Sequence, residues 1–216
     1  MNQQLKRTLL SLAGLGVFLL LALGSLPASN ENNSNQNSNR RSNPNTITYH
    51  NSSEQFTGQL ADNYVDFSFD YPNSWKRDPE AGTSSDPSFV KVEKTASNGF
   101  ENFAVAPCWA LRDELPQLAG RTSDQFSGGF PEYKKVSEGE IRIGSYDGYE
   151  FRFTSRIKPG QGRVWGRVVL LPGTGARKGA TLILLAMSAS SDVHGPEDVG
   201  EKGELPGILD SFRFGP

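Results

Sequence analysis

The sequence predicts an α+β fold in which an antiparallel sheet of about six strands is flanked by helices on both faces, an α/β/α sandwich. Two observations support this. Alternating apolar and polar residues recur in short segments from residue 65 to residue 189, as in strands joined by short loops. Helical spacing of apolar residues appears twice, once midway through this region and once near the end of the chain.

The N-terminus is typical of an export signal. Met1–Arg7 is positively charged, and Thr8–Leu26 then runs for 19 residues without a charge. Ala22-Leu23-Gly24 offers small residues around a cleavage site, but the uncharged run is also close to the about 20 residues that span a bilayer. We therefore interpret residues 1–28 as a signal peptide or an N-terminal membrane anchor. Both interpretations place the rest of the chain outside the cytoplasm, in a periplasmic, lumenal or cell-surface location.

Residues 29–53 are dominated by asparagine and serine. Such a segment has little apolar surface to offset the entropy lost on ordering, so we expect a disordered linker. Ile47–Tyr49 is the first sign of order within it. The folded domain is then expected over residues 54–216.

Charge and cysteine content exclude some classes of protein. Residues 1–53 carry a net charge of +3, whereas the remainder has 18 basic and 23 acidic residues and a net charge of -5. This acidic balance argues against nucleic acid as a partner. The single cysteine, Cys108, excludes an intramolecular disulfide and is expected to be a buried apolar residue.

The segment expected to organise the domain is Val65–Trp75. Its aromatic residues Phe67, Phe69 and Tyr71 fall on one face of a strand, because successive side chains of a strand alternate between faces. A proline then ends the strand, since it has no N–H to donate. The tryptophan that follows is expected to fold back over the apolar face.

The remaining strands follow the same alternation, and the last two are apolar enough to be buried on both faces. Gly139 predicts a bulge in the segment Lys134–Ile143, and the last three segments are expected to form a meander. The predicted segments are Phe89–Lys94, Asn102–Ala106, Lys134–Ile143, Tyr149–Thr154, Val164–Leu171 and Ala180–Ala189.

Two helices are expected. Thr122 and Gln125 resemble a capping box and predict a helix over Ser123–Phe130, after an interruption at Gly120. Near the C-terminus, apolar residues recur at i, i+3, i+4 and i+7 from Leu205 and predict a short amphipathic helix that packs on the sheet. A final strand or extended tail is expected over residues 212–214.

Four stretches in this order are typical of one known fold: Phe67–Trp75, Tyr146–Ser155, the strand pair Arg163–Leu171 and Ala180–Ala189, and Ile208–Phe214. They resemble the PsbP-like fold, named after the extrinsic PsbP subunit of photosystem II. The resemblance implies a six-stranded antiparallel sheet between helices and a non-enzymatic role. It transfers no functional residue, because the segment after Ser191 is richer in glycine than in relatives and the domain lacks their basic contact surface.

No catalytic set is recognised. Of the two histidines, His50 lies in the linker, so a Ser-His-Asp arrangement is not supported. The metal-ligand candidates are four oxygen- or nitrogen-bearing residues within a span of seven, although a solvated helix start is the favoured interpretation. They are Asp192, His194, Glu197 and Asp198. We expect no catalytic residue, cofactor or metal.

The expected function is that of a non-catalytic, extracytoplasmic module, membrane-tethered or secreted, that binds a protein or a membrane-complex partner. One alternative is a small-molecule, lipid or cation-binding domain with its site beside residues 190–203. Another is an extrinsic photosystem II-associated protein, if the source is photosynthetic. An exposed tryptophan among Trp75, Trp109 and Trp165 would indicate a partner surface.

Overall fold

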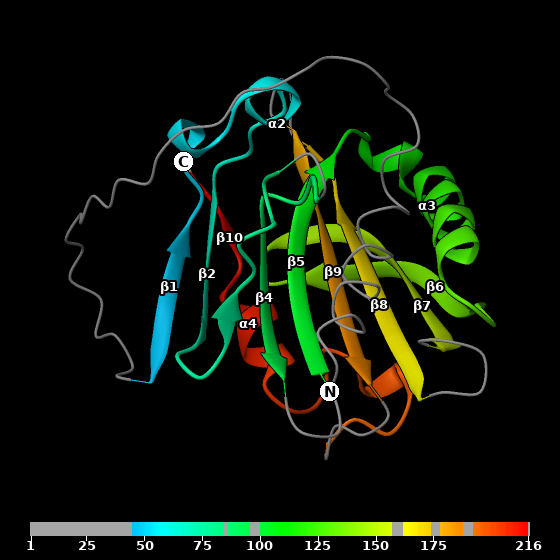
Figure 1. Cartoon of the computed structure of the whole chain (residues 1–216). Helices are drawn as coiled ribbons and strands as arrows, with labels where there is room; N and C mark the ends of the chain where they lie inside the picture. The colour runs from blue at the N-terminus through cyan, green and yellow to red at the C-terminus, as the bar shows by residue number, and fades with distance from the viewer. Residues whose placement is uncertain are drawn as a thin grey trace.

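The computed structural model describes residues 45–83, 86–95, 100–156, 162–173, 178–187 and 192–215. The signal peptide or anchor and the linker up to residue 44 lie outside the described residues. In the described part, two antiparallel sheets and a few helices form the α+β architecture that the sequence predicts (Figure 1). No helix in this part is long and apolar enough to cross a membrane.

The larger sheet has the strand order β3-β4-β5-β9-β8-β7-β6, and all its pairs are antiparallel. Strands β6 to β9 follow one another as neighbours, which confirms the predicted meander. The bounds are β3 (Lys76–Arg77), β4 (Val90–Thr95), β5 (Phe100–Cys108), β6 (Lys134–Ile143), β7 (Tyr146–Arg156), β8 (Arg163–Leu171) and β9 (Gly179–Met187).

Strands β5 and β9 lie at the centre of this sheet, and every one of their residues is buried. Their side chains alternate between two apolar clusters on opposite faces of the sheet. On β9, for example, Leu182 and Leu184 belong to one cluster and Ile183 and Leu185 to the other. Burial on both faces explains why this strand reads as a continuous apolar run.

The smaller sheet has the order β1-β2-β10, with β1 (Thr46–His50), β2 (Phe67–Pro72) and β10 (Arg213–Phe214). The segment expected to organise the domain therefore lies outside the main sheet. Its aromatic face nevertheless packs on that sheet, with the ring of Phe69 edge-on to Phe103 at 4.9 Å. Burial of these rings orders the two layers relative to each other.

Order begins earlier than the predicted boundary at residue 54. Strand β1 lies within the segment interpreted as linker, and it pairs with β2 along its whole length. Tyr49 is 7% exposed, and its ring lies 5.4 Å from that of Phe69. Pairing with β2 and burial of the Tyr49 ring therefore order the end of a segment that is mostly polar. It is followed by η1 (Ser53–Gln55) and α2 (Gly58–Asp62).

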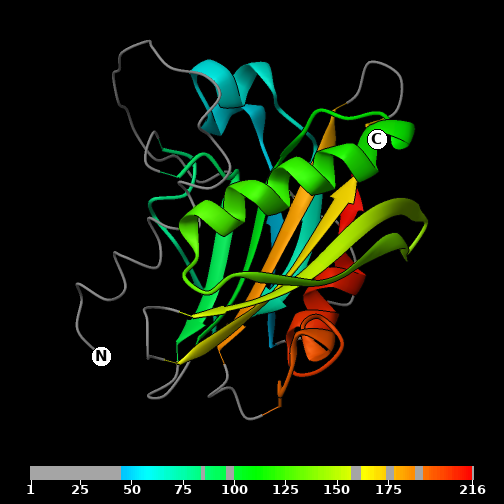
Figure 2. The ribbon, with the colours of Figure 1, turned by 90° about the vertical axis from the view of Figure 1, so that its right-hand side faces the viewer.

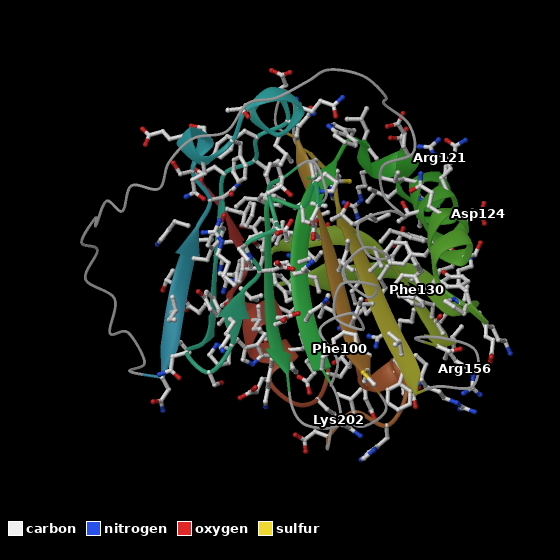
Figure 3. The ribbon with its side chains drawn as sticks, in the orientation of Figure 1. Phe100, Arg121, Asp124, Phe130, Arg156 and Lys202 are labelled. Atoms are coloured by element: carbon white, nitrogen blue, oxygen red, sulfur yellow. The ribbon has the colours of Figure 1, made fainter. Side chains whose placement is uncertain are left out.

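One face of the main sheet is covered by α3 (Leu115–Gly129), which follows η2 (Arg112–Glu114) and runs across the strands (Figure 2). Arg121 and Asp124 lie on its outer side, whereas Phe130 lies inside, against Phe153 (Figure 3). The helix is continuous through Gly120, so the predicted interruption is wrong. A glycine costs a helix about 1 kcal/mol, which burial of the helix's apolar side exceeds. Thr122 is consequently a buried mid-helix residue and no cap.

The opposite face is covered by the smaller sheet and by α4 (Leu205–Ser211). Leu205, Ile208 and Leu209 are buried there, as the sequence predicts. A short helix, η3 (Pro196–Asp198), precedes it. Helices therefore lie on both faces of the main sheet, although a second sheet shares one face with α4.

The bulge predicted at Gly139 occurs elsewhere on β6. Gly139 stays in register opposite Glu150, and the register shifts between Lys135 and Ser137 instead. The extra residue is Val136, whose side chain is 50% exposed. A glycine in a strand suggests a bulge but does not require one when its backbone can keep regular pairing.

Candidate functional site

Buried charges in the described part of the domain are the first place to look for chemistry. Lys91 of β4 is 1% exposed, and its Nζ lies 2.7 Å from Asp78 Oδ2 and 2.6 Å from Asp86 Oδ2. Burial lowers the pKa of Lys91, but the carboxylates of Asp86 and Asp78 raise it by more, so the side chain is charged at neutral pH.

The two aspartates come from the connection between β3 and β4, and each also orders that connection. The second oxygen of Asp78 accepts the backbone N–H of Glu80 at 2.9 Å, and that of Asp86 accepts the N–H of Ser88 at 3.1 Å. Both aspartates that pair with Lys91 thus also hold the backbone of this connection in place. The Lys91 cluster, defined by Lys91, Asp78 and Asp86, fixes the connection to the sheet.

A second buried cation is Arg167 of β8, which is 2% exposed. Its Nε lies 2.7 Å from Glu150 Oε2, and its Nη1 lies 2.9 Å from Glu201 Oε1 and donates to the carbonyl of Gly200 at 3.3 Å. Gly200 has φ +74°, and a Cβ there would lie 2.8 Å from that Nη1. Only glycine allows the backbone to approach the guanidinium so closely.

Arg152 of β7 is the cross-strand neighbour of Arg167 and binds the same segment. Its Nη1 donates to the carbonyls of Pro196 at 3.0 Å, Glu197 at 2.8 Å and Val199 at 3.2 Å. Its Nη2 lies 3.1 Å from Glu201 Oε1. The two arginines therefore occupy the interface between the sheet and residues 196–202, where the sequence-based alternative places a small-molecule or cation site.

A third polar cluster joins Trp75 and Lys94 to Glu204, the residue before α4. The Nε1 of Trp75, which is 3% exposed, donates to Glu204 Oε2 at 2.7 Å, and Lys94 Nζ lies 2.8 Å from the same oxygen. Partial burial raises the pKa of Glu204, but the hydrogen bonds from Lys94 and Trp75 outweigh it and leave the pKa below its ordinary value. The folded state therefore favours the ionised carboxylate.

This shift predicts an acid-dependent part of the stability. A depressed pKa stabilises the fold above the unfolded pKa of Glu204, and that stabilisation is lost as the pH falls through the folded pKa. Urea unfolding of Glu204→Gln, followed by tryptophan fluorescence from about pH 3 to pH 7, is expected to show a shallower acid decline than the wild type. Parallel curves for the two proteins would contradict the assignment.

The metal-ligand candidates all lie in the described 192–215 segment. The Asp198 carboxylate accepts the backbone N–H of His194 at 3.0 Å and pairs with Lys202 at 2.9 Å. These contacts lower its pKa. Within the described ranges, no group of three or more His, Cys, Asp or Glu side chains is placed to hold a metal ion, so Asp192 and Glu197 are not gathered with them.

Cys108 lies in the interior and is 1% exposed. Burial raises the pKa of its thiol to about 11. A nucleophilic cysteine needs a lowered pKa, because the thiolate is the reactive form. The expected apolar role of Cys108 is thus confirmed.

The surface offers a different kind of feature. Trp109 is 51% exposed and Leu111 is 57% exposed, in the connection from β5 to η2. The Nε1 of Trp109 donates to Asn63 Oδ1 at 3.0 Å, and Lys178 Nζ donates to the same oxygen at 2.6 Å. The other two tryptophans are buried. We refer to Trp109 and Leu111 as the Trp109–Leu111 surface.

Comparison with solved structures tests the fold. The chain matches cyanobacterial PsbP (CyanoP) from Synechocystis with a TM-score of 0.50 and 12% identity, covering 83% of this chain and 98% of that one. The fold is PsbP-like. At this identity the likeness concerns the fold alone, and the PsbP-like domain here has no residue role assigned by it.

Two further solved structures match less well. LpqN, described as involved in cell envelope biogenesis of Mycobacterium tuberculosis, has a TM-score of 0.47 and 11% identity, covering 79% of this chain and 92% of that one. A protein from Bacteroides thetaiotaomicron has a TM-score of 0.42 and 12% identity over 69% of this chain, which spans only 45% of that protein. No protein-family model and no curated protein matched the sequence.

Proposed function

We propose that this chain is a non-catalytic, extracytoplasmic PsbP-like module, secreted or tethered to a membrane, that binds a protein or a membrane-complex partner. The observation that carries the proposal is the Trp109–Leu111 surface. A tryptophan and a leucine, each more than half exposed, lie two positions apart in the connection from β5 to η2, on a domain whose other tryptophans are buried. Exposed large apolar side chains that lie together are typical of sites of protein contact.

The buried charges support the non-catalytic part of the proposal. Lys91 pairs with Asp78 and Asp86 of one connection. Arg152 and Arg167 pair with Glu201 of another, so these pairs fix connections to the main sheet. A catalytic group needs access to substrate and a pKa suited to proton or group transfer. The basic side chains of these pairs are buried or half-buried and bind other parts of the fold.

A double variant tests the partner surface. Trp109→Ser with Leu111→Ser is expected to reduce capture of the partner at least about tenfold, because central aromatic and aliphatic contacts contribute most to such interfaces. Crosslinking and quantitative mass spectrometry of the membrane fraction of the producing cell, with the full chain as bait, would measure it. The free energy of unfolding should change by no more than about 0.5 kcal/mol.

The control for this experiment is Val136→Ser, which alters a side chain of similar exposure on β6. It should leave capture at the wild-type level. Equal capture by the wild type and the double variant would overturn the assignment of the surface. Turnover of a substrate by the purified protein would overturn the non-catalytic role.

Localisation has its own test. A fusion of alkaline phosphatase to the C-terminus is expected to be active in the producing cell, because that enzyme needs an oxidising compartment to form its disulfides. Deleting Thr8–Leu26 should abolish this activity, since that run is the proposed signal or anchor. Activity that survives the deletion would contradict export through this segment.

A further inference from the structure

The two longest edge strands of the described sheets, β6 and β1, differ in chemistry. Strand β6 is protected against pairing with another chain by its bulge at Val136 and by charged side chains along its length. Those side chains are Lys134, Lys135, Glu138, Glu140 and Arg142. Strand β1 has the sequence Thr-Ile-Thr-Tyr-His, with no Lys, Arg, Asp or Glu, no proline and a regular register.

The backbone of β1 presents hydrogen-bonding groups at the open edge of the smaller sheet. The N–H of Asn51 donates to the carbonyl of Phe67 at 2.9 Å, which marks a hydrogen-bonded pair with β2. Bonded and non-bonded pairs alternate along an antiparallel ladder, so Tyr49 is the next residue bonded to β2. Thr48 and His50 therefore direct their N–H and C=O groups away from β2, toward the side on which no described strand lies.

The side chains of β1 add an apolar contribution at this edge. Ile47 lies on the same face of the strand as Tyr49, and it is 43% exposed although it faces the core side. The next strand of a sheet would cover it. Threonine, isoleucine and tyrosine are also the residue types that are most favourable in paired strands.

We propose that β1 pairs with β1 of a second copy of this chain, antiparallel and about a two-fold axis through Thr48. The two small sheets then form one continuous six-stranded sheet. In this register Thr48 lies opposite Thr48, Ile47 lies opposite Tyr49, and His50 lies opposite Thr46 of the second copy. At the axis, Thr48 of each strand presents the outward N–H and C=O groups that Thr48 of the other strand needs, as a two-fold interface requires.

Charge favours a second copy at this edge. The paired strands bring no two like charges opposite each other, whereas self-pairing of β6 would bring together ten charged side chains. Asp70 of β2 lies beside the axis and accepts a hydrogen bond from Thr48 at 2.6 Å. The two copies of β2 would lie three strand spacings apart, about 14 Å, so repulsion between these aspartates is screened at physiological salt.

A cysteine at the axis tests both pairing and register. Directly opposite residues in a hydrogen-bonded pair have Cα atoms about 5.5 Å apart, within the range that a disulfide spans. The full chain with Thr48→Cys is therefore expected to form a covalent dimer under mild oxidation, while native Cys108 stays buried. His50→Cys is the matched control, because the two His50 positions would lie about 14 Å apart, too far for a disulfide.

A backbone variant gives the reversible measurement. Thr48→Pro removes the outward N–H on both copies and leaves the ladder between β1 and β2 intact, so the dissociation constant of the dimer should rise about 30-fold. Thr48→Val keeps the N–H and should keep the dimer. Sedimentation equilibrium of the full chain, in detergent micelles of matched density, measures the mass of the species directly.

Three results would overturn the proposal. The wild-type chain could be a monomer at all concentrations, His50→Cys could crosslink as readily as Thr48→Cys, or a dimer could form that Thr48→Pro does not weaken. Unfolding of each variant by urea is compared with the wild type at a concentration where all are monomers. If the Thr48→Pro protein is unfolded, the crosslinking of Thr48→Cys compared with His50→Cys tests the proposal instead.

Discussion

Replacing Lys91 with methionine is expected to lower the free energy of unfolding by about 3–5 kcal/mol, the usual cost of removing one partner of a buried ion pair. The substitution conserves much of the side-chain volume but removes the ammonium. Asp78 and Asp86, which are 6% and 4% exposed, would then face each other without a cation. Urea unfolding at neutral pH, followed by tryptophan fluorescence, measures the loss.

The control removes the stranded charges as well. A triple variant with Lys91→Met, Asp78→Asn and Asp86→Asn is expected to recover about half of the lost stability, because two buried carboxylates become neutral amides. A loss below about 1 kcal/mol for Lys91→Met alone would contradict this account. It would show that the connection between β3 and β4 swings out and returns the aspartates to water at little cost.

Replacing Arg167 with methionine is expected to cost about 2–4 kcal/mol. The expected loss is smaller than for Lys91, since Glu150 keeps its contact with Arg152 at 3.1 Å and the Glu201 side chain is 55% exposed. The amide protons of residues 196–202 should exchange faster than in the wild type, because Arg167 is one of the two side chains that fix this segment. Urea unfolding and hydrogen exchange give the two measurements.

The matched control is Arg112→Met, which removes an arginine from a solvent-exposed pair with Asp147. Exposed ion pairs contribute about 0–1 kcal/mol, so this variant should be close to the wild type and leave exchange in residues 196–202 unchanged. Equal losses for Arg112→Met and Arg167→Met would mean that burial does not set the energy of the Arg167 contacts.

The periodicity of apolar residues predicts those strands and helices whose position depends on residues close together in the sequence. The strands of the meander and the helix beginning at Leu205 depend on apolar residues that recur at fixed spacing, and these elements are where the sequence places them. Gly120 and Gly139 show the limit of such reasoning. Each is a residue that often interrupts an element, and in each case packing or pairing across the fold keeps the element continuous.

The burial of Lys91 and Arg167 and their partners could not be predicted from neighbouring residues in the sequence. Lys91 occupies a polar position of an alternating strand, which normally faces solvent, and only the connection that folds over β4 turns that position into an interior one. Arg167 stands inside the apolar run of β8, where a lone charge is a signal of a buried partner. Its partners are Glu150 on the neighbouring strand and, from further along the chain, Gly200 and Glu201.

The smaller sheet also bears on how the chain folds. Strand β2 receives β1 on one side and β10, close to the last residue, on the other. A hydrogen bond from the backbone N–H of Asp70 to Ser211 Oγ joins positions 141 residues apart. Contacts of this sequence separation form late, since a long loop must close before they are made. The smaller sheet therefore cannot be completed during synthesis until residues 211–214 have left the ribosome.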